Sequence, residues 1–150
     1  MTVTLDYASV KNLDRLCEIE KECFDLEAFT RKQIAQLLTD YNTVSLVARE
    51  NGEIVGFVVG AIYPDGEAVS GHVLTIDVSS SHRRRGIGKM LLKEMESIFV
   101  QKGVGVSCLE VREDNAAALG LYRELGYKRV ARLENYYRNA HGIRLRKMLT

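Results

Sequence analysis

The chain has 150 residues, 46% of them hydrophobic and 27% charged, and this size and composition fit a single globular domain over residues 1–150. Its formal net charge is +1, which disfavours a dedicated nucleic-acid-binding protein, because such domains carry a clear basic excess. Its three cysteines lack the CxxC spacing of zinc sites and are odd in number, so reduced thiols in a cytoplasmic protein fit better than a disulfide framework.

Hydrophobic periodicity predicts the elements in chain order, because alternating apolar residues mark strands and apolar residues spaced by three or four mark amphipathic helices. Asn51-Gly52 between two apolar runs is a strong β-hairpin signal. Thr30 can cap a helix, and Gly103 and Gly126 can end helices. The predicted strands lie at 2–7, 43–50, 53–63, 67–78, 104–111, 127–136 and 142–149, and the predicted helices at 10–23, 30–38, 86–102 and 115–125.

The order of these elements predicts an α/β (α+β) fold. The strand at 67–78 leads through a helix into the strand at 104–111, so this pair is expected to be parallel, whereas the other pairs are expected to be antiparallel. We therefore expect one mixed, mostly antiparallel central sheet flanked by about four helices. The opening residues, MTVTLDYASV, contain no apolar run that would predict a signal peptide or a membrane anchor.

Residues 82–89, HRRRGIGK, join a predicted strand to a predicted helix. The N–H groups at a helix N-terminus are unpaired and attract anions, and glycines allow a ligand to approach the backbone closely. The spacing R-x-x-G-x-G matches neither the Walker loop nor the Rossmann fingerprint. Taken alone, the segment leaves three interpretations open: a nucleic-acid patch, a phosphate cradle, or a solvated arginine turn before an ordinary helix.

Glu110 ends an otherwise apolar strand face formed by Val104, Val106 and Cys108. Burial there would raise the pKa of its carboxyl and favour a proton acceptor that works near neutral pH. The structural alternative is a strand-end glutamate that pairs with Arg112 or with water.

Other polar residues also have two interpretations. Tyr122 lies on the apolar face of its predicted helix, where a tyrosine is often part of the core, and Asn115 can be an ordinary N-cap. A lone histidine such as His72 in a strand is usually structural. Tyr136 and Tyr137 suit a sheet.

The order and spacing of HRRRGIGKMLL, LEVREDNAAALGLYRELGY and NYYRNAHG resemble the GNAT superfamily of acetyl-CoA-dependent N-acetyltransferases. The resemblance covers nearly the whole chain and is strongest from residue 71 to 142. Within the superfamily, the chain looks most like N-terminal acetyltransferases, both the bacterial ribosomal-protein-alanine type and the archaeal and eukaryotic catalytic subunits. The resemblance implies acetyl-CoA as cofactor without a metal, and a protein or peptide N-terminus as acceptor, with ribosomal proteins among the candidates. It implies no nucleic-acid or membrane partner and allows an auxiliary subunit.

The resemblance also implies a cofactor site. The loop would wrap the pyrophosphate of coenzyme A through Arg83, Arg84, Arg85, Gly86, Ile87, Gly88 and Lys89. The preceding strand would offer backbone groups of Ile76, Asp77 and Val78 to the pantetheine arm and the acetyl carbonyl, and a bulge would splay this strand from its parallel neighbour and open a slot. Asn115 would contact the cofactor. Asp77 departs from the family, which often has a small apolar residue there.

For catalysis, the resemblance makes Glu110 the general base and Tyr122 the general acid beside the cofactor sulfur. His72 is a secondary candidate for proton transfer, and the N–H of Val78 would stabilise the oxyanion.

The acceptor would be recognised by Phe24, Glu27 and Phe29 and by the pair Tyr136 and Tyr137. DLEAF stands where the bacterial type has a Pro-Trp pair, so the preferred N-terminal sequence stays open. Two other functions also stay open: an acetyltransferase for lysine or small amines, and a non-catalytic acetyl-CoA-binding module.

Overall fold

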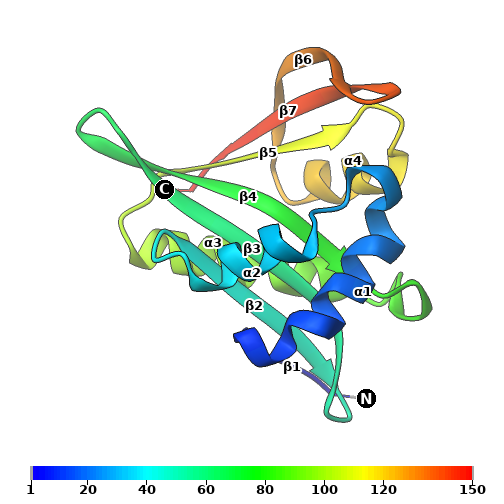
Figure 1. Ribbon diagram of the computed structural model, residues 1–150. Helices are drawn as coiled ribbons and strands as arrows, with labels where there is room; N and C mark the ends of the chain where they lie inside the picture. Colours follow the sequence, from blue (N-terminus) through cyan, green and yellow to red (C-terminus); the bar gives the residue numbers. More distant parts are fainter. Residues whose placement is uncertain (1, 150) are drawn as a thin grey trace.

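A computed structural model describes residues 2–149, and these form one seven-stranded mixed sheet with helices on both faces (Figure 1). The strand order is β1-β2-β3-β4-β5-β7-β6, and only β4 and β5 pair in parallel among these neighbours. The strands are β1 (Val3–Tyr7), β2 (Thr43–Glu50), β3 (Glu53–Asp65), β4 (Ala68–Val78), β5 (Val106–Arg112), β6 (Lys128–Tyr137) and β7 (Ala140–Met148). The helices are α1 (Leu13–Phe24), α2 (Arg31–Thr39), α3 (Ile87–Gln101) and α4 (Ala116–Glu124), with short 3-10 turns at Val10–Asn12, Asp25–Glu27 and Ser80–His82. The predicted fold class is confirmed.

Several local predictions are also confirmed. Asn51 and Gly52 both have positive φ, 53° and 81°, as a two-residue hairpin turn requires. The Thr30 hydroxyl accepts the N–H of Gln33 at 3.1 Å and caps α2. Several boundaries shift by one to three residues. Helix α1 begins at Leu13 after a separately capped 3-10 turn, β3 ends at Asp65 rather than 63, β5 begins at Val106 rather than 104, and β7 begins at Ala140 rather than 142.

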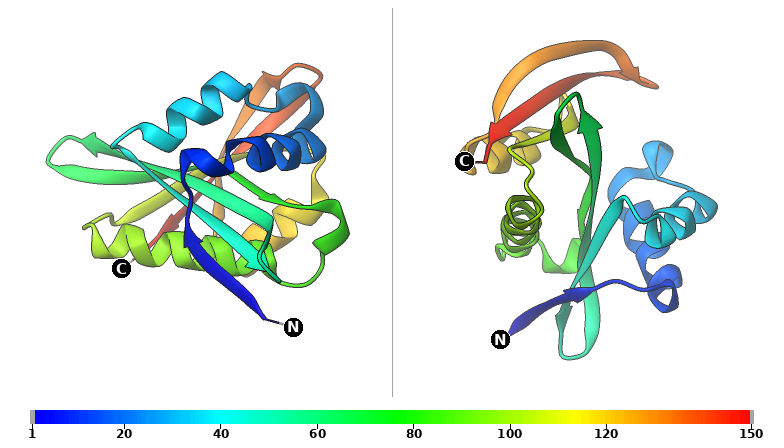
Figure 2. Two further views of the ribbon diagram at one scale, coloured as in Figure 1. Left: turned by 60° about the horizontal axis from the view of Figure 1, so that its bottom comes forward. Right: turned by 90° about the vertical axis from the view of Figure 1, so that its left-hand side faces the viewer.

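The helices divide the core into two layers. Helices α1 and α2 cover one face of the sheet, while α3 and α4 lie on the other face (Figure 2). Phe57 is fully buried under α1 and α2, and Phe99 of α3 is fully buried in the opposite layer. The packing therefore holds β2, β3 and β4 rigidly between two apolar layers.

The parallel pair is short, and this opens the sheet. Strands β4 and β5 are paired only at Gly71↔Ser107 and His72↔Cys108. Beyond these residues the two strands diverge (Figure 1). The register between β3 and β4 shifts by one residue at Leu74, which is therefore the bulged residue. The expected bulge and splay are present, and the bulge lies just before the residues 75–78 that lead to the loop.

Candidate active site

A cavity of about 410 Å³ lies where β4 and β5 separate, and we call it the slot. Its walls come from segments that are distant in sequence: α1 and the segment after it, β4, β5, α4 and the end of β6. The lining residues are Glu20, Cys23, Phe24, Glu27 and Phe29; Val73, Leu74, Thr75 and Ile76; Leu109, Glu110, Val111 and Arg112; Asn115, Ala118 and Tyr122; and Tyr136 and Tyr137.

The start of α3 offers unpaired backbone N–H groups. Gly86 is its N-cap, with φ of 79° and no side-chain cap, and the first helical N–H to find an acceptor is that of Met90, which bonds to the Gly86 carbonyl at 3.0 Å. The N–H groups of residues 87–89 find no acceptor among residues 2–149. A Cβ at Gly86 would lie in open space, but the positive φ favours glycine. This end of α3 therefore has the donors and the room for an anion.

The basic side chains of this loop are partly engaged elsewhere. Arg85 pairs with Glu50, and Lys89 contacts Glu124 at 2.9 Å. Arg83 donates from Nε to the Val78 carbonyl at 3.2 Å. Arg84 is exposed and has φ of 64°, an unusual value for a residue other than glycine. In this structure backbone N–H groups are the more available donors, and contact of the three arginines with phosphate stays a prediction.

The backbone groups of Ile76 and Val78, at the end of β4, point to one side of the strand, and those of Asp77 point to the other. The N–H of Ser79 bonds to the Val55 carbonyl of β3 at 2.8 Å, so the alternation of an antiparallel ladder turns the backbone groups of Val78 away from β3 and toward the gap beside β5. Ile76 has the same orientation and lines the slot. Asp77 does not: its backbone lies opposite Phe57 in the ladder, and its side chain is buried.

Glu110 lies in the slot, but in surroundings that differ from the expected apolar face. Its strand neighbours Leu109 and Val111 are buried, whereas the face that carries Glu110 is only partly covered. Its Oε1 lies 2.6 Å from His72 Nε2, and its Oε2 accepts from Arg144 Nε at 3.1 Å. Burial acts to raise the pKa of Glu110, but the hydrogen bonds from His72 and Arg144 and the charge of Arg144 outweigh burial and hold it below its usual value. The expected rise in pKa is therefore wrong.

Tyr122 of α4 also lines the slot. Its side chain is 7% exposed, and its ring packs edge-on against Tyr127 at 6.0 Å. Burial is the main cause that raises the pKa of its hydroxyl. The hydroxyl has no hydrogen-bond partner within residues 2–149. It is therefore a neutral proton donor at physiological pH.

Both tyrosines of the pair reach the slot because β6 is irregular. Adjacent residues of a regular strand point to opposite faces, yet Tyr136 and Tyr137 both line the slot. The β6–β7 register shifts between Leu133 and Tyr137, and Asn135 has φ of 53°, so this bulge turns the two side chains together. A Cβ at Gly142 would lie 3.1 Å from Tyr136, so the glycine gives the rings room.

The segment after α1 is attached to β5. Glu27 accepts from Arg112 at 2.7 Å, and Phe24 and Phe29 complete this wall. Asn115 also borders the slot, but its Oδ1 accepts the N–H of Ala118 at 3.1 Å and caps α4. The N-cap interpretation of Asn115 therefore holds, and its amide NH₂ is the part that can face a ligand.

Sequence reasoning missed several residues of the site. Arg144 reaches Glu110 from the neighbouring strand, and Cys23, Glu20 and Thr75 lie in the wall. Only the strand pairing of Glu110 with Arg144 could have suggested one of these contacts in advance.

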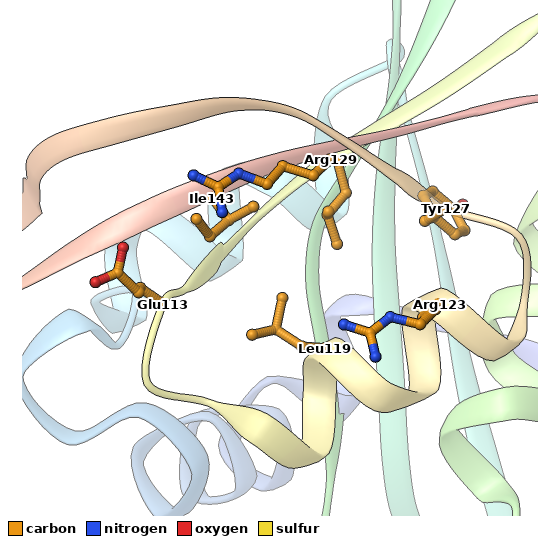
Figure 3. A pocket seen from close by; sticks show the side chains of 7 residues that line it. Glu113, Leu119, Arg123, Tyr127, Arg129 and Ile143 are labelled. Carbon is orange, nitrogen blue, oxygen red and sulfur yellow. The ribbon is translucent and has the colours of Figure 1, made fainter.

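A second, smaller hollow of about 180 Å³ lies between α4 and the β6–β7 pair (Figure 3). Arg123 and Leu119 border it from α4, and Glu113, Tyr127 and Arg129 border it as well. None of the residues that line this hollow was predicted for the site, so the chemistry is better placed in the slot.

No group of three or more His, Cys, Asp or Glu side chains within residues 2–149 is arranged to hold a metal ion. None of the helices in the described part of the chain is long and apolar enough to cross a membrane.

Comparison with known proteins agrees with this geometry. The chain is 30% identical over 142 residues to a protein of Sulfurisphaera tokodaii described as N-alpha-acetyltransferase, a match that covers 87% of this chain and 83% of the relative. It is 41% identical over 91 residues to N-alpha-acetyltransferase RimI of Mycobacterium tuberculosis, covering 61% and 56% of the two chains.

Solved structures have the same fold. Ard1 from Thermoplasma volcanium superposes with a TM-score of 0.91 at 25% identity, covering 100% of this chain and 99% of that one. The ribosomal-protein-S18-alanine N-acetyltransferase of Escherichia coli gives a TM-score of 0.89 at 23% identity, covering 99% and 95%. Residues 13–127 match the family model of the acetyltransferase (GNAT) family, and with the relatives above this match shows that the chain belongs to that family and is an N-acetyltransferase.

Proposed function

We propose that this protein transfers the acetyl group of acetyl-CoA to the N-terminal α-amine of a protein, by direct attack while both substrates are bound. The observation that carries the proposal is the slot itself, which brings the Glu110–His72 pair, the neutral hydroxyl of Tyr122 and the tyrosine pair to one cavity. The name of the Sulfurisphaera relative, N-alpha-acetyltransferase, also describes transfer to an α-amine.

The residues at the start of α3, which we call the donor end of the slot because the acetyl donor would bind there, fit coenzyme A. The unpaired N–H groups of Ile87, Gly88 and Lys89 suit its pyrophosphate, and the open space at Gly86 lets an anion approach. The backbone of Val78 faces the gap, where its N–H can donate to a carbonyl oxygen that becomes negative. Bound acetyl-CoA supplies the thioester that the amine attacks.

The acceptor end has groups for proton removal. The attacking amine must be neutral, and a free α-amine has a pKa of roughly 7.7–8.0 against about 10.4 for lysine, a difference worth about 3.4 kcal/mol. Because the pKa of Glu110 is lowered, its carboxylate alone is a weak base, and we assign proton acceptance to Glu110 together with His72. Tyr122 then donates its proton to the departing sulfur, and no metal takes part in this scheme.

The tyrosine pair and the segment after α1 would hold the incoming chain. Tyr137 stacks edge-on against Tyr136 with ring centroids 5.0 Å apart, and the Arg112 guanidinium lies 5.8 Å from the Tyr137 ring. The contact between Arg112 and Glu27 leaves neither charge free to select an acidic or basic residue without breaking the pair. Phenol hydroxyls are suited to hydrogen bonds with peptide groups.

An acetylation assay with purified protein tests the proposal. The substrates are peptides with free N-termini, the same peptides with blocked N-termini and an internal lysine, and polyamines. We expect turnover of the free N-termini and little with the blocked peptides. Turnover restricted to lysine or to polyamines would contradict the proposal and favour the alternative acceptor class.

A further inference from the structure

Two buried carboxyl groups lie beside the slot without a role in the scheme above. Glu20 of α1 is 2% exposed and Asp77 of β4 is 1% exposed. Both contact the same atom, because Thr75 Oγ1 lies 3.0 Å from Glu20 Oε1 and 2.6 Å from Asp77 Oδ1. Glu20 and Thr75 also line the slot.

This arrangement needs a proton that the hydroxyl cannot supply. A threonine hydroxyl has one proton to donate, so it can bond to only one of two ionised carboxylates. With both groups ionised, the other oxygen–oxygen contact would hold two acceptors and no hydrogen, and two negative charges would face each other in a buried site. One carboxyl group must therefore be protonated and must donate to Thr75.

Asp77 is the better holder of that proton. Glu20 Oε2 accepts the backbone N–H of Phe29 at 3.0 Å, and this hydrogen bond stabilises a carboxylate. Asp77 Oδ2 is buried with no hydrogen-bond partner in the described chain, which a neutral carboxyl tolerates better than a charged one. Burial and the nearby charge of Glu20 also raise the pKa of Asp77 well above its usual value.

The other charged and titratable groups near Asp77 do not replace the proton. Arg83 is the cation that acts on it, but Arg83 donates to the Val78 carbonyl and to Cys23 rather than to Asp77. Cys23 of α1 and Tyr122 of α4 are both neutral, since their pKa values are raised, and β3 presents Phe57. By contrast, the buried carboxylates of Glu50 and Glu96 each contact a cationic side chain.

We propose that Glu20 and Asp77 are positioning residues that share one proton through Thr75, and that this proton holds the segment after α1 against the acceptor side of the slot. The chain of donors runs from Asp77 to Thr75, from Thr75 to Glu20, and from the Phe29 N–H to Glu20. The second half of this inference rests on the proposed function, because it assumes that the acceptor enters beside Phe29.

The proposal predicts sensitivity to high pH. As the pH rises through the raised pKa of Asp77, its carboxylate competes with Glu20 for the Thr75 proton and repels it. The bond to Phe29 then weakens, so KM for the acceptor rises while the affinity for acetyl-CoA stays the same. The expected rise is roughly 2- to 12-fold, the range that one net hydrogen bond contributes.

Infrared difference spectroscopy of the wild-type protein at pH 7 tests the shared proton directly. We expect the carbonyl band of one protonated carboxyl group. Asp77→Asn and Glu20→Gln each supply an amide N–H to Thr75, so either substitution should remove the band because the remaining carboxyl ionises. Glu18→Gln is the matched control on the exposed side of α1, and it should leave the band in place. Absence of the band in the wild type, or its survival in either amide variant, overturns the shared proton.

The position of Phe29 tests the second part of the proposal, that the shared proton holds the segment after α1 in place. Its amide NMR signal should titrate together with the infrared band in the wild type and should be independent of alkaline pH in Asp77→Asn. The alkaline rise in KM should likewise disappear in Asp77→Asn. If the band behaves as expected but the Phe29 signal does not follow it, the positioning role is overturned. Both spectroscopic measurements need no substrate, so a protein that fails to acetylate peptides contradicts the proposed function and not the shared proton.

Discussion

The two ends of the slot offer different kinds of atoms. The start of α3 is one contiguous segment, and its unpaired donors are backbone N–H groups. The acceptor side instead collects side chains from α1, β4, β5, β6 and β7. A backbone site depends on the path of the chain, so a single glycine controls it, whereas a side-chain site is built from separate contributions that can be removed one at a time.

Gly86→Glu should break the backbone end and give the largest effect. The substitution places a residue with a side chain at φ of 79° and adds negative charge beside unpaired N–H groups. We expect loss of measurable acetyl-CoA binding by calorimetry. Gly66→Glu is the matched control, because Gly66 has φ of 67° and equally open surroundings in the β3–β4 turn. Unchanged acetyl-CoA affinity in Gly86→Glu would refute the assignment of the loop.

Tyr122→Phe, at the side-chain end of the slot, should lower the rate of the chemical step without weakening the binding of acetyl-CoA. The variant removes the neutral hydroxyl while keeping the buried ring, so kcat should fall by roughly 10²- to 10⁴-fold with little change in acetyl-CoA affinity. Tyr127→Phe serves as control, since its hydroxyl bonds to Ser107 outside the slot. An equal loss of kcat in both variants would indicate a packing effect.

Glu110→Gln should lower turnover by about 10²-fold, mainly below about pH 8, where the amine still has to lose a proton. Because His72 and Arg144 hold the pKa of Glu110 below its usual value, the wild-type carboxylate keeps its charge through the usual titration range of a glutamate and loses it only at more acidic pH. Its contribution to stability therefore disappears only in acid. If the pH–rate profile of Glu110→Gln were identical to that of the wild type, the general base would be assigned to His72 instead of Glu110.

Tyr137→Phe should give the smallest effect and sharpen the comparison. Loss of one hydroxyl should raise KM for the peptide by roughly 2- to 12-fold and leave acetyl-CoA binding unchanged. Tyr41→Phe, at a side chain that is 96% exposed, controls for the substitution itself. If the substitution changed the affinity for acetyl-CoA instead, Tyr137 would be assigned to the cofactor site and not to peptide binding.

The contrast between a contiguous segment and side chains from distant elements also explains which features could be predicted from the sequence. The Asn51-Gly52 turn, the Thr30 cap and the loop before α3 are local, so their patterns predict them directly. The surroundings of Glu110 are not local, because His72 and Arg144 are 38 and 34 residues away in sequence and reverse the expected shift of its pKa.

The bulge that turns Tyr136 and Tyr137 to one side could also not be predicted from the sequence. It depends on a positive φ at Asn135 and on the register of β6 against β7, and an alternating strand pattern indicates neither. Likewise, the position of Asp77 suggested a departure from the family, but its partner Glu20 lies on a different element.

The two-residue pairing of β4 with β5 has a consequence for solubility. Past His72 and Cys108, each strand has an unpaired edge in the middle of the sheet, and unpaired edges are the usual starting points of strand-to-strand aggregation. The segment after α1 and the two tyrosines line the slot between these edges. Ligands that occupy the gap should therefore act as protectants: they should slow aggregation and raise the melting temperature, with a stabilisation that grows with the logarithm of the ligand concentration divided by Kd.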